Sequence, residues 1–200
     1  MHQLLLINFY LFVMALFLAV LEIQIEGEHG WAKNLPTWRP KQDSWYTKVY
    51  SSIMSGKELT GYHLTIFLFL LLVFHLPFVF GIGWNFVLWV KVLSFYFMFL
   101  VVWDFLWFVL NPHYPLRQFK KEHVWWHKKW LLGLPVDYYS GILVSLLILL
   151  PAKFMYGGVG LLSWWFANIR FFAIDLIVVI LIAEFVIGLN NFGKEEQAPE

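Results

Sequence analysis

Five apolar stretches, each long enough to cross a lipid bilayer, dominate this sequence. A spanning helix needs about 20 mostly apolar residues, because the hydrocarbon core is about 30 Å thick and a helix rises about 1.5 Å per residue. The stretches predict an all-α fold, a polytopic helical membrane protein with five transmembrane helices and two long cytoplasmic loops. The predicted helices are residues 4–25, 63–82, 86–110, 138–156 and 171–190.

Composition agrees with a membrane protein. Of the 200 residues 60% are hydrophobic and only 14% are charged, whereas a soluble domain averages about 25% charged residues. We expect one transmembrane domain over residues 1–192 and a disordered polar tail over 193–200. The first apolar stretch lacks the basic start and the small-residue cleavage site of a signal peptide, so we expect it to be a retained helix.

The basic residues are distributed unevenly between the two sides that five helices create. Eleven of the fourteen lysines and arginines fall in loops 26–62 and 111–137 or in the C-terminal tail, and the remaining three fall on the other side. Cytoplasmic loops carry an excess of lysine and arginine. We therefore expect a plasma (inner) membrane protein with its N-terminus outside and its C-terminus in the cytoplasm.

Three carboxylates lie near the predicted cytoplasmic ends of three helices that run in the same direction. Glu22, Asp104 and Glu184 each precede the end of their helix by about three to six residues, which corresponds to a common depth of about 5–9 Å. Ionisable side chains inside a bilayer are costly and usually functional. Three carboxylates at one level would need protons or cations to coexist, so we expect them to converge around a metal ion.

Neighbouring residues add further candidate ligands. Glu26 and His29 follow Glu22 on one helical face, at i+4 and i+7, if the helix continues that far. In "EHVWWHKKW" (122–130), His123 and His127 share a face if that segment is helical, and this spacing lets two imidazoles bind one ion. The alternative is that this basic, aromatic loop folds back onto the membrane, with Trp125 and Trp126 at the interface.

The candidate ligands also have structural interpretations. Glu22 and Asp104 could pair with a lysine or arginine of a loop, and Glu26 could simply be solvated. His75, next to Pro77, could satisfy backbone groups that the proline leaves free.

The chemistry that these residues favour is that of a divalent metal. The chain has no cysteine, so thiolate sites are excluded, and a mixed carboxylate and imidazole site favours Zn, Fe or Mn. We therefore expect a metal site near the cytoplasmic leaflet, in an enzyme whose lipid-like substrate approaches laterally.

Two other classes of protein fit the same sequence. Asp175, His75 and the carboxylate layer could form the relay of a proton-coupled or ion-coupled transporter. Alternatively, the chain could be a small accessory subunit of a larger membrane complex. We expect membrane lipids as partners, with a homo-oligomer or a larger complex also compatible, and no binding of nucleic acid.

Overall fold

Five long apolar helices form the structure, as the sequence predicts. The computed structural model describes residues 2–114, 116–157 and 160–188. The helices long and apolar enough to cross a membrane are His2–Glu26, Gly61–Val79, Phe86–Leu110, Val136–Met155 and Leu161–Phe185. The elements in chain order are α1 (His2–Glu26), α2 (Trp45–Ile53), α3 (Gly61–Val79), α4 (Phe86–Leu110), η1 (Leu116–Gln118), β1 (Trp130–Leu131), β2 (Leu134–Pro135), α5 (Val136–Leu147), α6 (Leu150–Tyr156), α7 (Leu161–Leu181) and η2 (Ile182–Ile187).

The boundaries differ from the predicted ones in two places. The last span begins at Leu161 rather than at residue 171, because the polar residues Asn168 and Arg170 lie on a helix and not in a loop. The fourth span consists of two short helices, α5 and α6, that follow each other directly. The predicted helix end at residue 190 and the tail 193–200 lie outside the described residues.

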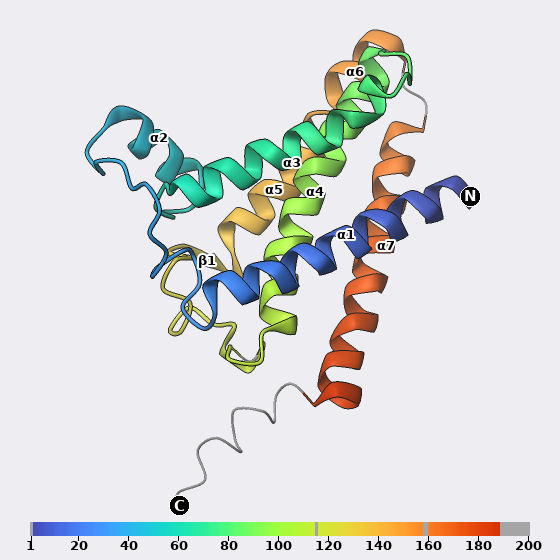
Figure 1. The fold of residues 1–200 in the computed structure, drawn as a ribbon. Coiled ribbons are helices and arrows are strands. Elements are labelled where there is room, and N and C mark those ends of the chain that lie inside the picture. The colour runs from blue at the N-terminus through green and yellow to red at the C-terminus, as the bar shows by residue number, and fades with distance from the viewer. Residues whose placement is uncertain (1, 115, 158–159, 189–200) are drawn as a thin grey trace, which may run out of the picture.

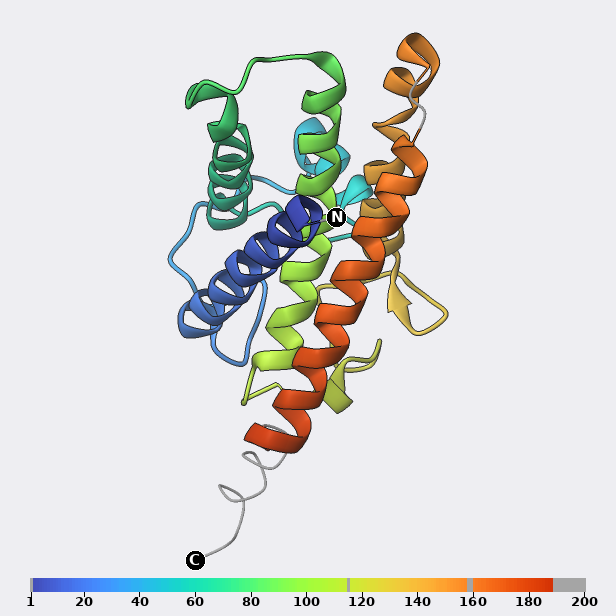
Figure 2. The same cartoon turned by 90° about the vertical axis from the view of Figure 1, so that its right-hand side faces the viewer.

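Helix α4 forms the centre of the bundle. It packs against α1, α3, α5, α6 and α7, and it contributes more buried residues than any other described element. Figure 2 shows α7 running beside α4, with α1 crossing in front of α4. The apolar sequence of α4 is compatible with contacts on all sides, although α1 and α3 are as uniformly apolar and bury fewer residues.

A buried polar contact joins α1 to α7. The Asn8 side-chain amide donates to Asn168 Oδ1 (2.7 Å) and to the Leu4 carbonyl oxygen (2.8 Å), and both asparagines are fully buried. Asn168 in turn donates to the Trp164 carbonyl oxygen. Interhelical hydrogen bonds of this kind hold membrane helices together where no hydrophobic driving force acts between them.

Residues 27–60, 111–114 and 116–135 form a cap over one end of the bundle. The cap carries α2 and the β1–β2 hairpin, which lie beyond the same helix ends (Figure 1). The two loops contact each other directly: the Trp125 indole donates to the His29 carbonyl oxygen at 3.0 Å, and Trp31 and Trp126 belong to one buried aromatic cluster. The two long loops therefore share one side, while their cytoplasmic location stays a prediction.

The segment 122–130 differs from the sequence interpretation. It forms turns and extended chain, not a helix, so His123 and His127 do not share a helical face. His123 is exposed and His127 is buried. Trp126 is also buried, stacked on Phe108 with ring centroids 5.6 Å apart, so it packs inside the protein. Only Trp125, which is half exposed, remains available to the membrane interface.

The turn after α1 provides a test of the cap. Gly27 and Gly30 both have φ of +61°, but a Cβ on Gly27 would meet open space, whereas one on Gly30 would lie 2.5 Å from Trp126 Cη2. Gly27→Ala should cost only the backbone strain of a positive φ, about 1–2 kcal/mol. Gly30→Ala should cost clearly more, because the same strain is added to a collision with the ring. Thermal unfolding of the two purified variants measures the difference, and equal losses would contradict this packing.

Candidate metal centre and charged network

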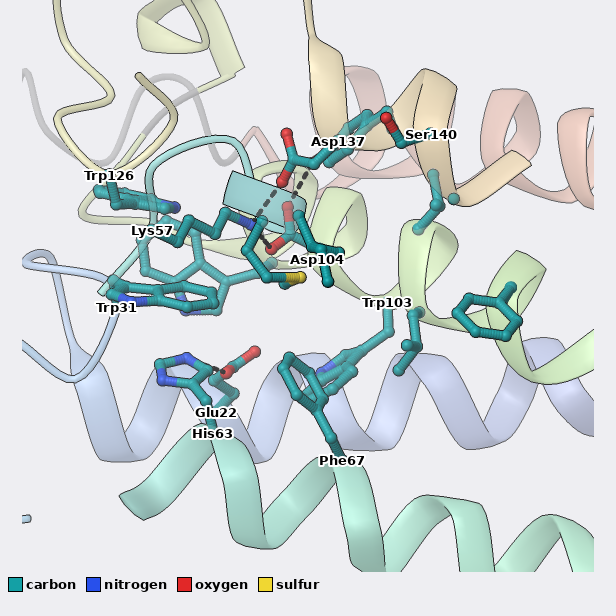
Figure 3. A pocket seen from close by; sticks show the side chains of 18 of the residues that line it. Glu22, Trp31, Lys57, His63, Phe67, Trp103, Asp104, Trp126, Asp137 and Ser140 are labelled. Atoms are coloured by element: carbon teal, nitrogen blue, oxygen red, sulfur yellow. Dashed lines mark hydrogen bonds and ion pairs between the residues drawn. The ribbon is translucent and has the colours of Figure 1, made fainter. Parts of the chain in front are cut away.

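A cavity of about 150 Å³ lies beneath the cap, and four of the five spans contribute to its walls. Figure 3 shows Lys57 and Asp104 near Glu22 and His63, with Trp31 and Trp126 among them, and Phe67 and Trp103 farther along the cavity. The polar lining residues are Glu22, Glu26, Lys57, His63, Asp104, Asp137, Tyr138 and Ser140. They form two neighbouring groups, one of candidate metal ligands and one of ion pairs.

Glu22, Glu26 and His63 form the candidate metal centre. One ligand atom from each lies within 4.8 Å of the other two, and all three residues are buried. His63 Nε2 lies 3.5 Å from Glu26 Oε1 and 3.8 Å from Glu22 Oε1. Two ligands that each lie about 2.1 Å from a tetrahedral zinc ion are separated by about 3.4 Å. The two distances from Nε2 are therefore close to those that one small ion would impose.

Helix geometry accounts for the two glutamates. Residues at i and i+4 lie on one face of a helix, and α1 continues through Glu26 before it ends at Gly27, whose positive φ suits a helix end. Glu26 Oε1 accepts a hydrogen bond from the Ala32 backbone amide in the first loop of the cap. Glu22 has no hydrogen bond to a described residue, and its nearest polar partner is His63.

His63 is oriented by the start of α3. Thr60 is the N-cap residue, and its hydroxyl accepts from the His63 backbone N–H at 3.3 Å and lies 2.8 Å from His63 Nδ1. The Nδ1 atom is thus engaged, and Nε2 faces the two carboxylates. Metal-binding histidines are commonly held in this way, with the second ring nitrogen hydrogen-bonded to a fixed group.

The neighbouring group is a ring of ion pairs centred on Lys57. Its Nζ lies 2.8 Å from Asp137 Oδ2 and 3.2 Å from Asp104 Oδ1. His127 closes the ring, with Nδ1 3.1 Å from Asp137 Oδ1 and Nε2 3.3 Å from Asp104 Oδ2. The Tyr138 hydroxyl adds a hydrogen bond to Asp104 Oδ2 at 2.5 Å. Lys57 and His127 come from the cap, whereas both aspartates come from spanning helices.

Lys57 stays charged in this environment. Burial by itself would lower its pKa, but Asp104 and Asp137 act in the opposite direction through their charges and hydrogen bonds, and together they raise the pKa above the ordinary 10.5. A raised pKa in the folded state means that the pairing stabilises the protein fully below the unfolded value. This contribution is lost only as pH rises through the raised pKa, so it is present throughout the neutral range.

Trp31 separates the two groups. The His63 ring stacks on it, with centroids 3.7 Å apart and planes at 13°. Lys57 Nζ lies 4.5 Å from the Trp31 ring centroid. Figure 3 shows Lys57 on one side of the indole and His63 on the other. The Trp31 indole also donates to the Glu58 carbonyl oxygen at 2.7 Å, which fixes the ring.

The structure brings together some of the residues that the sequence singles out, but not all of them. Glu22 and Glu26 are adjacent and face the cavity, and Asp104 and His127 pair with each other in the Lys57 ring. His29 lies beyond the end of α1, 3.9 Å from Glu28 and partly exposed. His123 is exposed, and Glu184 lies in the π-helical turn η2, away from the cavity lining.

Sequence reasoning missed three residues of the site. His63, Lys57 and Asp137 sit at or just before the beginning of an apolar stretch, where a charged or polar residue is read as solvated loop. The available signal for His63 was the N-cap threonine three residues earlier, which moves the helix start from residue 63 to residue 61 and places His63 in the first turn. Nothing local indicates that Lys57 is buried, because its burial depends on the packing of the cap.

His75 is not suited to the relay that the transporter hypothesis requires. Its Nδ1 lies 2.7 Å from the Leu71 carbonyl oxygen, which only accepts, and its Nε2 accepts from the Trp89 indole at 3.1 Å. Both ring nitrogens are therefore engaged in hydrogen bonds within the protein.

Comparisons with protein-family models, with curated proteins and with solved structures find no match. The function is accordingly argued from the geometry of the cavity.

Replacing Lys57 tests the ion-pair ring. Lys57→Met keeps the length of the side chain but leaves two carboxylates without their cation, and breaking a buried pair in this way costs about 3–5 kcal/mol. The exposed Lys48 provides the matched control, and Lys48→Met should change stability by no more than about 0.5 kcal/mol. Thermal unfolding at neutral pH compares the two. If Lys57→Met were as stable as Lys48→Met, the ring would not hold the cap in place.

Proposed function

We propose that this protein is a metal-dependent membrane enzyme that acts on a lipid-like substrate. One observation carries the proposal: the three candidate metal ligands and a row of apolar side chains line the same cavity. A water-soluble substrate would not need a cavity that extends between membrane helices along apolar side chains. A lipid-like molecule could place its reactive polar end beside the ligands and its chain along the apolar wall.

The donor set supports a divalent transition metal. Two carboxylates and one imidazole, without any thiolate, suit Zn, Fe or Mn. Three protein ligands leave a coordination position open, which is the arrangement of catalytic rather than structural zinc sites. Such an ion supplies Lewis acidity and a bound water of lowered pKa.

The protein's own residues contribute binding, orientation and exclusion of water. Thr60 holds the His63 ring in position, and Trp31 covers one face of it. The cap closes one end of the cavity through the Lys57 ring. Glu22, which is buried without a hydrogen bond to a described residue, would gain its missing partner from the ion.

The charges at the site also favour a cation. Glu22 and Glu26 are two buried carboxylates on one helix face, and Lys57 is already paired with Asp104 and Asp137. Two adjacent buried carboxylates without a partner repel each other, so a shared proton or a metal ion must compensate them. We further propose a plasma-membrane location with the cap on the cytoplasmic side, which the basic residues of the cap support.

Metal binding tests the proposal. The protein purified without chelators should contain close to one equivalent of Zn, Fe or Mn, measured by elemental analysis. Glu22→Gln should reduce the bound metal at least tenfold, because it removes a charged ligand and keeps the shape of the side chain. Affinity should also fall as pH is lowered, since the ligands must be deprotonated to bind.

The matched control is Glu28→Gln, which makes the same change at an exposed residue of the adjacent loop. It should retain the metal content of the unmodified protein. Absence of metal from the purified protein, together with failure to bind added zinc, manganese or ferrous ion, would rule out the proposal and favour an accessory subunit. Equal metal content in both variants would exclude Glu22 as a ligand.

A further inference from the structure

The apolar part of the cavity has a defined shape. Away from the ligands, the wall is made by side chains of α3, α4 and α5, which we call the apolar arm: Phe67, Phe97, Leu100, Val101, Gly141 and Val144. Figure 3 shows one of them, Phe67, beside Trp103 and on the far side of Glu22 and His63 from Trp126. The polar and apolar ends are thus parts of one continuous space.

The arm runs along two antiparallel helices. On α4 the cavity lining extends from Asp104 to Phe97, and on α5 it extends from Asp137 to Val144. Each distance along the chain is seven residues. Seven residues of helix correspond to about 10 Å. Because α4 and α5 run in opposite directions, both sets of residues lead from the charged end toward the middle of the spans. The arm therefore points into the depth occupied by lipid chains.

Exposure differs between the two ends of the cavity. Glu22, Glu26, Lys57 and His63 are buried, whereas Asp104, Asp137, Ser140 and every residue of the apolar arm are partly exposed. The surface around the arm belongs to spanning helices, where the surrounding medium is lipid. This distribution is the one expected for a cavity whose apolar end opens sideways to the bilayer and whose candidate metal ligands lie away from the surface.

Close packing defines the floor of the arm. A Cβ on Gly141 would lie 2.6 Å from Val101 Cγ2, so the absence of a side chain allows α5 to approach α4 there.

The indole N–H groups of Trp103 and Trp107, both in the cavity wall, have no hydrogen-bond partner among the described residues. Buried donors without a partner are typical of a site that a bound oxygen atom or water completes.

We propose that the apolar arm binds the single alkyl chain of an amphiphile that enters from the bilayer, with its oxygen-bearing polar end at the Glu22–Glu26–His63 group. The placement of the polar end rests on the proposed function, whereas binding of the chain rests on the arm alone. The arm is bordered by α3 and α5 over a floor of α4, and the whole cavity has a volume of only about 150 Å³, which favours a single-chain amphiphile.

Photolabelling tests the binding of the chain. The protein in lipid nanodiscs is irradiated with a medium-length fatty alcohol that carries a diazirine on its chain, and labelled residues are located by mass spectrometry. Labelling should concentrate on the arm residues of α4 and α5, and an excess of unlabelled alcohol should compete for these positions. Val144→Trp should reduce labelling of the arm at least fivefold by filling it.

Leu143→Trp is the matched control, because Leu143 is the exposed neighbour of Val144 on α5 and lies outside the cavity lining. It should leave labelling of the arm unchanged. Labels spread evenly over lipid-facing residues, or arm labelling that neither competitor nor Val144→Trp reduces, would overturn the proposal.

Metal content, measured on the same samples, separates the two proposals. Val144→Trp should keep its metal, since the substitution lies far from the ligands. Specific labelling of the arm in a protein that binds no metal would leave the chain site standing and reject the metal centre. Bound metal without specific labelling of the arm would support the metal centre and reject the chain site.

Discussion

The burial of Lys57 between two aspartates is the interaction on which the site depends. It joins a loop of the cap to α4 and α5 through contacts of 2.8 and 3.2 Å. A charged lysine that is buried against an apolar helix bundle is stable only with such partners. Removing either the lysine or the aspartates would leave an uncompensated buried charge. The Lys57 ring thus sets where the cap sits. The cap in turn places Trp31 against His63 and the Ala32 amide on Glu26.

The structure separates the candidate metal ligands from the ion-pair ring, whereas the sequence interpretation places residues of both in one metal site. Four acidic residues surround the cavity, and the sequence interpretation assigns Asp104 and His127 to the same metal site as Glu22. In the fold, Asp104 and His127 lie in the ring with Lys57 and Asp137, and both aspartates pair with the lysine. The acidic residues left without a lysine are Glu22 and Glu26, and these are the ones that face a free imidazole nitrogen. This division favours a metal at one group and a structural role for the other.

Hydrophobic length and helix periodicity were enough to predict the spans and part of the site. The apolar run 86–110 coincides with α4, and the i, i+4 spacing of Glu22 and Glu26 correctly indicates one shared face. His29, another predicted ligand, would share that face only if the helix passed Gly27, and it does not. His63 of α3 lies beside the two glutamates instead, and no periodic pattern links residues of different helices. The burial of Lys57 likewise depends on contacts between segments that are distant in the sequence.

X-ray absorption spectroscopy of the zinc-loaded protein tests most directly whether Glu22, Glu26 and His63 together bind one metal ion. We expect a coordination shell of one nitrogen and oxygen ligands at about 2.0–2.2 Å, with the outer-shell scattering of a single imidazole. This imidazole signal should disappear in His63→Ala and persist in His29→Ala. A shell of oxygen atoms alone, or an imidazole signal that His63→Ala leaves unchanged, would contradict this metal site.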